Sequence, residues 1–316
     1  MDTTSLTTAT AKIATFRTHL LDWWQANRRD LPWRETRDPY AILVSEVMLQ
    51  QTQVERVIPH FHRWLEQYPT LQALSDAPTA EVIQLWAGLG YNRRAVNLQR
   101  TAQAVVERGG EFPRAVESLK ALPGIGPYTA GAIACFAFEQ DVAFIDTNMR
   151  RVLHRVLLGP EIPVRLANDR EITALAAAIP AGQGWAWNQA LIEFGALHCT
   201  ARRPLCVMCP IQKECAAWPE IQSLIAAQPK GLKSANEGPF KESNRYFRGR
   251  VVNALRERRD AGITFAELGP LVRPAFAEGD LPWLLDLVHG LERDGLAAIA
   301  EEPAPYDVAE TRVLLP

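Results

Sequence analysis

The 316-residue sequence predicts a mostly helical protein of about two domains. Apolar residues recur at spacings of three and four through most of the first 225 residues, where no convincing alternating strand pattern is found. Hydrophobic residues make up 47% and charged residues 22% of the chain, ordinary values for a protein that buries a core. Four of the five cysteines fall between Cys199 and Cys215. This clustering indicates a metal or cluster site in a reducing compartment rather than a disulfide framework.

The helices of the first 225 residues are predicted from periodicity. The first helix is predicted from one apolar stripe: Ile13, Phe16, Leu20 and Trp24. The second is predicted from one shared face, with Glu46 a short rotation away: Val44, Met48, Gln51 and Glu55. Further helical patterns cover roughly 79–87, 91–107, 114–121, 127–138, 147–157, 166–179 and 186–197. We therefore expect an all-α core over residues 1–227.

The C-terminal part is predicted to be a separate small module. Residues 228–243 are polar, with two glycines and two prolines, and are interpreted as a linker. Within 244–316, helical patterns are followed by a candidate hairpin: helices at 245–258, 265–272 and 281–295, and strands at 297–299 and 313–315. That order resembles a winged-helix module.

Hydropathy excludes a membrane span, and the charge distribution is compatible with a nucleic-acid partner. The longest apolar stretch, 130–138, is too short to cross a bilayer. The Thr-rich N-terminus shows no basic region followed by an apolar run, so we expect no secretory signal. Residues 260–316 hold 11 acidic and 3 basic side chains, and the remainder 31 basic and 25 acidic. This asymmetry is compatible with a nucleic-acid-binding core that carries an acidic appendage.

The segment from Leu122 to Thr129 (LPGIGPYT) lies between two predicted helices. Pro127 suits the first turn of the second helix, where its missing N–H costs nothing. Gly124 and Gly126 allow a close approach of the backbone and expose N–H groups beside a helix N-terminus, which is a geometry that binds phosphate. The alternative is a tightly packed corner between two helices.

Two acidic residues are candidate catalytic groups. Asp146 precedes a helical pattern, so it is predicted to be the N-cap of a helix. The helix dipole would keep its carboxylate ionised, and an ionised carboxylate is suited to stabilising a nearby cation. Glu46 lies among the apolar residues Val44, Val47 and Leu49. Desolvation there would raise the pKa of Glu46 and make it a candidate general acid. The alternatives are a purely structural cap and a surface glutamate.

The cysteine spacing Cys199-x6-Cys206-x2-Cys209-x5-Cys215 suits either a [4Fe–4S] cluster or a tetrahedral zinc. Zinc sites more often carry two Cys-x2-Cys pairs, and this sequence has one. The spacing therefore favours the cluster. Cys135 lies in an apolar helical pattern and is predicted to be a buried, inert cysteine.

Taken together, these motifs resemble the helix-hairpin-helix DNA glycosylases and, within them, the adenine glycosylases of the MutY type. The resemblance covers roughly residues 15–220 and follows the order of the family's motifs. It rests on Asp30–Arg34 (DLPWR), Glu46 with Gln50–Thr52 (QQT), Gly88–Tyr91 (GLGY), the Leu122–Thr129 hairpin, Asp146 and the four cysteines.

The resemblance implies two all-α lobes with DNA between them and an adenine flipped out of the stack. It implies that Glu46 protonates the adenine ring as general acid, and that Asp146, supported by Asn148, stabilises the oxocarbenium-like sugar. Tyr128 stands where lyase-type relatives place a Schiff-base lysine. The resemblance therefore implies a monofunctional glycosylase that leaves an abasic site.

Other roles are implied in the same way. Gln51 matches a residue that wedges into the duplex, and Tyr91 one that stacks beside the orphan base. Four residues match the wall of the adenine pocket: Arg29, Leu31, Trp33 and Gln189. The alternative for Leu31 and Trp33 is a place in the core, and for Gln189 that of an ordinary polar residue of a helix. The cofactor implied is a [4Fe–4S] cluster. The partner implied is double-stranded DNA containing a mismatched adenine, bound by a monomer in the cytoplasm of a bacterial-type cell, at the nucleoid.

Residues 228–316 are too short for the larger C-terminal domain with which MutY enzymes recognise 8-oxoguanine. We expect removal of adenine mispaired with guanine or 8-oxoguanine. Two alternatives stay open, a thymine/uracil glycosylase for G·T or G·U mismatches and a non-catalytic iron–sulfur DNA-binding protein. Gln50–Thr52 favours adenine, because thymine-directed relatives carry arginines there. Glu46 and Asp146 speak against a binding module, which needs neither.

Overall fold

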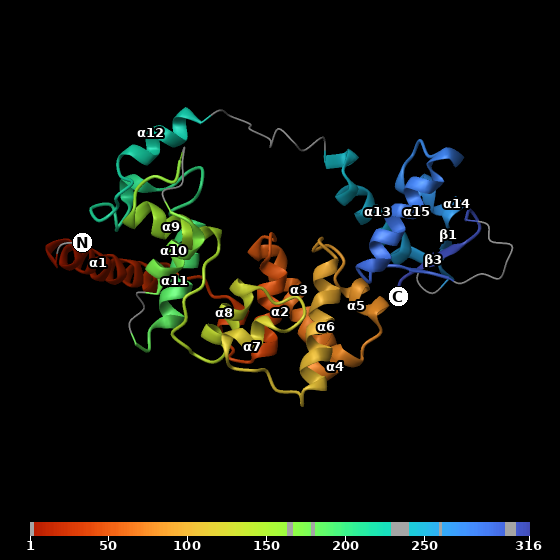
Figure 1. Cartoon of the computed structure of the whole chain (residues 1–316), viewed down its shortest axis with the longest axis horizontal. Helices are drawn as coiled ribbons and strands as arrows, with labels where there is room; N and C mark the ends of the chain where they lie inside the picture. The colour runs from red at the N-terminus through yellow and green to blue at the C-terminus, as the bar shows by residue number, and fades with distance from the viewer. Residues whose placement is uncertain (1–2, 163–166, 178–180, 229–239, 259–260, 301–307) are drawn as a thin grey trace. The chain divides into compact units, whose positions relative to one another are not determined.

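The computed structural model describes residues 3–162, 167–177, 181–228, 240–258, 261–300 and 308–316 (Figure 1). The described chain is mostly helical, which confirms the predicted fold class. It forms two compact units. The first comprises residues 1–42, 113–121 and 125–231, and the second comprises residues 43–112, 122–124 and 232–316.

The first unit is built on α1 (Thr3–Asn27), α9 (Thr147–Leu157) and α11 (Gly184–Leu197). The predicted stripe of α1 is confirmed, because Phe16 and Leu20 are fully buried and Trp24 is 2% exposed. α11 packs against both α1 and α9. Phe16 meets Trp187 of α11 edge-on, with ring centroids 5.5 Å apart. This contact between two large aromatic rings buries apolar area between α1 and α11.

The two helices of the helical hairpin also belong to the first unit. α7 (Val116–Lys120) and α8 (Pro127–Phe136) are joined by residues 121–126, and Pro127 occupies the first turn of α8, as predicted. α8 is buried from Thr129 to Phe136. The unit is completed by α10 (Asp169–Ala176), which begins at a capping box, and by α12 (Glu220–Ala227), which follows the cysteine loop.

The second unit contains α3 (Val54–Gln67), α4 (Leu71–Asp76), α5 (Thr79–Leu85) and α6 (Arg93–Glu107), and α2 (Pro39–Leu49) leads into it from the first unit. α6 packs against α4 and α5. Trp64 of α3 meets Trp86 edge-on at 5.4 Å, and both rings are buried.

The prediction that Val44, Met48, Gln51 and Glu55 share one helix face is wrong. α2 ends at Leu49, and Gln51 has a φ of 54°, so the chain turns before α3 begins. The physical reason is Arg94, whose guanidinium donates hydrogen bonds to the carbonyl oxygens of Val47, Met48 and Gln50. Arg94 thus supplies donors for carbonyl oxygens that the end of a helix leaves without an intrahelical partner.

The C-terminal module has the predicted winged-helix order. α13 (Asn244–Arg258) is followed by β1 (Ile263–Thr264), α14 (Phe265–Val272), α15 (Leu281–Arg293), β2 (Ala298–Ile299) and β3 (Arg312–Leu314). The sheet order is β1-β3-β2 with both pairs antiparallel, and Val313 faces Ile263 and Ile299. The three helices and the hairpin are confirmed. β1 was not expected, because two residues are too short for a period to be recognised.

This module shares one hydrophobic core with α5 and α6. Its fully buried residues, such as Phe265 and Leu268, belong to the same cluster as Ile83 of α5 and Val96 of α6. Most of the predicted linker 228–243 lies outside the described residues, since 229–239 are not described. Residues 240–242 form a short 3-10 turn that leads into α13.

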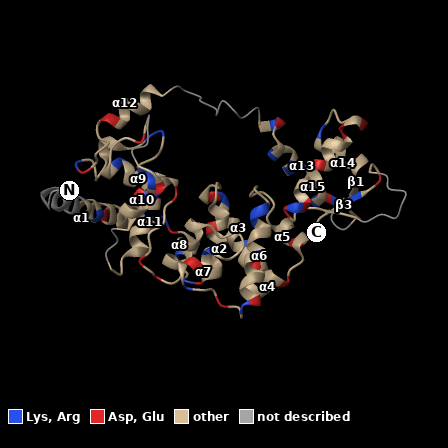
Figure 2. Ribbon diagram, in the orientation of Figure 1, with Lys and Arg blue, Asp and Glu red and all other residues tan. Residues whose placement is uncertain are grey.

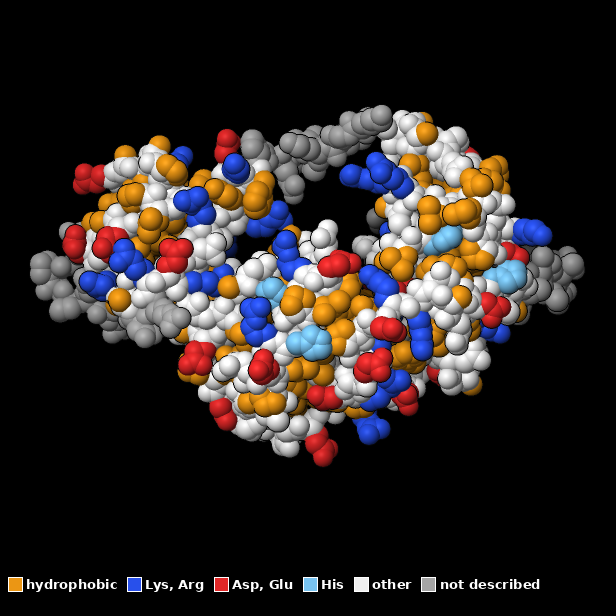
Figure 3. Space-filling view, turned by 180° about the vertical axis from the view of Figure 1, so that it is seen from behind, with side chains coloured by type: hydrophobic (Ala, Val, Ile, Leu, Met, Phe, Trp, Pro, Cys, Tyr) orange, Lys and Arg blue, Asp and Glu red, His pale blue; other side chains and the backbone are white. Residues whose placement is uncertain are grey.

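The charges are distributed unevenly along the ribbon (Figure 2). Over much of the face drawn in Figure 3, acidic and basic side chains are interspersed. Among the described helices, none combines the length and the apolar composition that a bilayer crossing requires.

Candidate active site and cysteine loop

Asp146 caps α9, as predicted. Its Oδ1 accepts a hydrogen bond from the Met149 N–H at 2.7 Å, and its Oδ2 accepts one from the Asn148 side-chain amide at 3.0 Å. Burial raises the pKa of Asp146, while these two donors and the charge of Arg151 act in the opposite direction. The carboxylate is therefore fixed in direction and poorly solvated, and a cation beside it would be strongly stabilised.

Arg151, one helical turn along α9, supports this arrangement. Its Nη2 donates to the Asn148 side-chain oxygen at 2.8 Å and to the Gly195 carbonyl at 2.6 Å. Its Nε donates to the Cys199 carbonyl at 2.7 Å. A continuous chain of hydrogen bonds thus connects Asp146 through Asn148 and Arg151 to the first residue of the cysteine loop.

Glu46 lies on α2 and is 6% exposed, so it is buried as the sequence predicts and is not a surface glutamate. Val44 beside it is fully buried, and Val47 is 6% exposed. Glu46 belongs to the second unit and Asp146 to the first.

Gly124 and Gly126 of the hairpin meet different structural requirements. Gly124 has a φ of 76°, and a Cβ there would lie 2.8 Å from Cβ of Asn97, so any side chain is excluded on both counts. Gly126 has an ordinary φ of −88° as the N-cap of α8, and a Cβ would meet nothing within 4 Å. At Gly126, the N-cap of α8, there is therefore open space where a side chain would stand.

Tyr128 follows on the first turn of α8, where its ring meets Phe144 edge-on at 5.4 Å. Lys120, the nearest lysine along the chain, ends α7 and pairs with Glu117 at 2.9 Å.

The structure brings two of the predicted pocket residues into one polar cluster. Arg29 pairs with Glu193 at 2.8 Å, and Gln189 accepts a hydrogen bond from Arg34 at 3.0 Å. Arg34 also pairs with Glu193 at 2.5 Å and donates to the carbonyl of Arg29. Burial would raise the pKa of Glu193, but the hydrogen bonds and charges of the two arginines outweigh it and lower that pKa. Glu193 is thus a buried carboxylate that holds Arg29 and Arg34 in fixed positions.

Leu31 and Trp33 are 5% and 7% exposed. Both side chains are thus buried, and their role in the wall of the pocket stays a prediction. Sequence reasoning missed Arg34 and Glu193 as site residues. The only signal for Glu193 was a carboxylate inside an otherwise apolar helical segment, α11.

Gln51 and Tyr91 lie together in the second unit. The Tyr91 hydroxyl donates to Oε1 of Gln51 at 2.5 Å, and the two residues have φ values of 47° and 54°. Such values are uncommon for residues other than glycine, and they cluster at functional loops. Tyr91 is also 42% exposed, unusual for a large aromatic ring in this chain.

Arg94 was missed as a site residue. Besides the three carbonyls at the end of α2, its Nη2 donates to the Thr52 hydroxyl and to the carbonyls of Leu89 and Gly90 at 3.1–3.2 Å. Burial lowers the pKa of Arg94 to about 10, so it stays charged at neutral pH. One guanidinium therefore fixes both the loop of Gln51 and the loop of Tyr91.

The four cysteines of the loop line a single cavity together with Arg155 and His198. The Arg155 Nη1 donates to Sγ of Cys199 at 3.7 Å and to the Thr200 carbonyl at 2.8 Å, while Glu161 pairs with the same guanidinium at 2.6 Å. Burial raises the pKa of Cys209 to about 12 and also raises that of Cys199. Nowhere in the described part of the chain are three or more His, Cys, Asp or Glu side chains grouped to hold a single metal ion.

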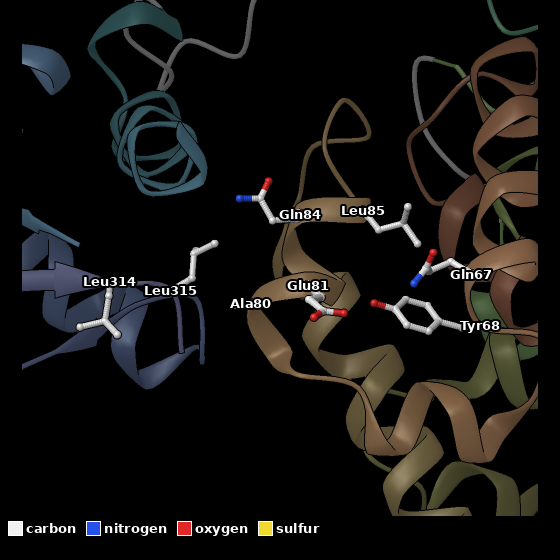
Figure 4. Close-up of a pocket in the computed structure, with 8 residues that line it drawn as sticks. All are labelled: Gln67, Tyr68, Ala80, Glu81, Gln84, Leu85, Leu314 and Leu315. Atoms are coloured by element: carbon white, nitrogen blue, oxygen red, sulfur yellow. The ribbon is translucent and has the colours of Figure 1, made fainter. Parts of the chain in front are cut away.

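A separate cavity of about 650 Å³ lies in the second unit (Figure 4). It is lined by residues of α3, α5 and the end of the chain, and none of the predicted site residues lies in it: Gln67, Tyr68, Ala80, Glu81, Gln84, Leu85, Leu314 and Leu315. Burial and the charge of Glu81 raise the pKa of Tyr68 to about 12, so this phenol stays neutral.

Known structures share this fold. A thermostable thymine-DNA glycosylase superposes with a TM-score of 0.62 at 31% identity, over 66% of this chain and 98% of that one. Endonuclease III in a non-covalent complex with DNA gives a TM-score of 0.58 at 25% identity, over 65% of this chain and 94% of that one.

Comparison with proteins of similar sequence identifies the family more narrowly than the structural neighbours do. Residues 44–175 match the HhH-GPD superfamily of base excision DNA repair proteins. The chain is 38% identical to an adenine DNA glycosylase of Mycolicibacterium smegmatis, over 90% of this chain and 95% of the relative. It is 46% identical to the adenine DNA glycosylase of Mus musculus, over 67% of this chain, but spans only 43% of that protein. The chain therefore belongs to the adenine DNA glycosylases of the HhH-GPD superfamily.

Proposed function

We propose that this chain is a monofunctional DNA glycosylase that releases adenine mispaired with guanine or 8-oxoguanine. The observation that carries the proposal is Asp146, a buried carboxylate held in one orientation by Met149 and Asn148. Membership of the adenine DNA glycosylases supports the choice of base.

Two carboxyl groups divide the chemistry. Protonation of the flipped adenine ring by Glu46 makes the base a neutral leaving group when its bond to C1′ breaks and the bonding electrons pass to the ring. The positive charge that develops on the sugar is stabilised by Asp146, and water then adds to C1′ and loses a proton to the solvent. The burial of Glu46 beside the apolar residues Val44 and Val47 supports its role.

Tyr128 supports the monofunctional reaction. A lyase needs an amine at this place to form a Schiff base with the sugar. The phenol cannot do so, and Lys120 is engaged with Glu117 on α7. The expected product is an abasic site in an intact strand.

We propose that Gln51 and Tyr91 enter the duplex beside the orphan base. They are joined by a hydrogen bond, and Tyr91 is exposed. The cluster of Arg29, Arg34, Gln189 and Glu193 forms a rigid wall of the adenine pocket, with Leu31 and Trp33 packed beside it. The open space at Gly126 admits a backbone phosphate to the first turn of α8.

We propose that Cys199, Cys206, Cys209 and Cys215 bind a [4Fe–4S] cluster. The donor set fits, because the four thiols line one cavity. Burial raises the pKa values of Cys199, Cys206 and Cys209, so their thiolates need a metal centre to stabilise them. The cluster, when bound, would supply structural cross-links rather than reaction chemistry. Arg155 and Arg151 would then fix the loop on α9 through Cys199.

The rival function is removal of thymine or uracil opposite guanine, and it is favoured by the similarity to a thymine-DNA glycosylase structure. Gln50–Thr52 opposes it, because the thymine-directed relatives carry arginines at these positions.

The test is single-turnover cleavage of duplexes that contain A·8-oxoguanine, A·G, A·C, T·G or U·G, read with and without alkali. Alkali-dependent cleavage at adenine is expected for the wild type. E46Q and D146N should bind the A·G duplex and lose cleavage, whereas E117Q, which changes an exposed carboxylate on α7, should keep it. Cleavage at thymine or uracil alone would establish the rival function, and full activity of E46Q would contradict the assignment of the acid.

A further inference from the structure

The C-terminal module separates its charges. α13 carries five arginines and one acidic residue, Glu257. Residues 260–316, which follow it, hold 11 acidic and 3 basic side chains. The positive charge of the module therefore lies on α13, which shares the hydrophobic core of α5 and α6 (Figure 2).

This charge faces a groove of about 770 Å³ within the second unit. The groove, here called the arginine groove, has six arginines and a single carboxylate among its lining residues: Arg56, Arg93, Arg94, Arg245, Arg248 and Arg250, with Asp294. Gln51 and Tyr91 line the same groove. An excess of positive charge in a concave surface attracts a partner rich in phosphate.

Most of these arginines already have structural partners. Asp294 pairs with Arg93 at 3.3 Å and also with Arg248. Arg94 is buried among carbonyl groups, and Arg250 donates to the Leu271 carbonyl and to the Tyr246 hydroxyl.

Two arginines are different. Arg56 on α3 and Arg245 on α13 are exposed, and neither forms an ion pair within the described part of the chain. The Arg245 Nη1 donates to the Tyr91 hydroxyl at 2.8 Å. Its guanidinium carbon lies 5.4 Å from the Tyr91 ring centroid and 4.9 Å from that of Phe240, which is 55% exposed. Exposed aromatic rings that alternate with unpaired positive charge are typical of nucleic-acid surfaces.

We propose that Arg56 and Arg245 bind backbone phosphates of the strand that carries the orphan base, so that α13 of the winged-helix module forms part of the DNA interface. The proposal rests on the function proposed above, because Gln51 and Tyr91 place that strand at the arginine groove. Arg245 is connected to both residues by the hydrogen bonds from its guanidinium to Tyr91 and from Tyr91 to Gln51. The acidic remainder of the module takes no part in the contact.

The test measures the dissociation constant of the full chain for an A·G duplex that carries a non-cleavable 2′-fluoro-adenosine, over a series of salt concentrations. R245Q and R56Q should each weaken binding about eightfold at about 0.1 M salt, because one fewer counterion is released. The slope of log Kd against log salt should fall by about 0.9 in each variant. R245K should restore the slope, because it keeps the charge.

R312Q is the matched control, since it removes one exposed arginine from β3 of the same module outside the arginine groove. It should bind like the wild type. An unchanged salt slope in R245Q would overturn the proposal, because loss of a purely structural contact with Tyr91 does not change counterion release. An R312Q variant that loses affinity while R245Q does not would overturn it as well.

Adenine release from an ordinary A·G duplex, measured in parallel, separates the two proposals. If the wild type releases adenine and R245Q keeps the wild-type salt slope, the contact is refuted and the function stands. If the wild type binds without releasing a base, the function is refuted, and the salt slopes still decide the contact.

Discussion

Arg94 is expected to be the residue on which the loops of Gln51 and Tyr91 depend. Its guanidinium donates to six acceptors, five of which are backbone carbonyls, and the residue is 9% exposed. R94M keeps most of the aliphatic packing and removes every one of these donors. The end of α2 and the turn at residues 89–90 then lose their shared partner.

The size of the effect follows from the burial of those acceptors. A hydrogen bond to a charged group contributes about 1.5–3 kcal/mol, but such values do not add within one network. Water can reach part of the site, and the variant no longer has to bury a charge. We therefore expect R94M to lower the free energy of unfolding by about 3–5 kcal/mol. R94K keeps the charge but has at most three N–H donors, so its free energy of unfolding should fall by about half as much as that of R94M.

Urea unfolding followed by circular dichroism measures these differences. R293M, which removes an exposed arginine at the end of α15, is the control and should change stability by less than about 0.5 kcal/mol. Where R94M still folds, its affinity for the non-cleavable A·G duplex should also fall, because Gln51 and Tyr91 lose their fixed positions. A loss below about 1 kcal/mol in R94M would show that the two loops are held by other contacts.

Three further changes test the site. Burial raises the pKa of Asp146 above its ordinary value of about 3.8. The folded state therefore binds the proton of Asp146 more tightly than the unfolded state does. This stabilisation is fully present below pH 3.8 and is lost as the pH rises through the folded-state pKa. In urea unfolding the wild type should therefore lose stability relative to D146N over this window, and a difference that is constant with pH would contradict the assignment. R151Q removes the support of Asn148 and should slow adenine release about tenfold or more while leaving duplex affinity unchanged, and an unchanged rate would show that Asn148 needs no such support. C209S should lose iron and visible absorbance while C135A keeps both, and a wild-type protein purified with zinc instead would contradict the proposed cofactor.

The sequence predicted those features that depend on neighbours along the chain. The α1 stripe, Pro127 in the first turn of α8 and Asp146 as the N-cap of α9 each follow from a local rule of helix geometry. The order of elements in the C-terminal module also followed from helical periods and the candidate hairpin.

The features that escaped prediction depend on tertiary contacts. The break after Leu49 is set by Arg94, a residue 45 positions later, whose neighbours in sequence give no sign of the carbonyls it binds. Glu193 pairs with arginines more than 150 positions earlier. The contact between Arg245 and Tyr91 joins the C-terminal module to a loop 154 positions earlier. Patterns among neighbouring residues in the sequence do not predict contacts between residues so far apart.

The measurement that tests the proposed function most directly is the identity of the base that the wild-type chain sets free. Duplexes containing A·8-oxoguanine, A·G, T·G or U·G are incubated with excess protein, and the free bases are separated and identified by mass. Adenine should be the only base released, with the DNA strand left intact until alkali is added. Release of thymine or uracil, or of no base from any duplex that the protein binds, would contradict an adenine glycosylase built on Glu46 and Asp146.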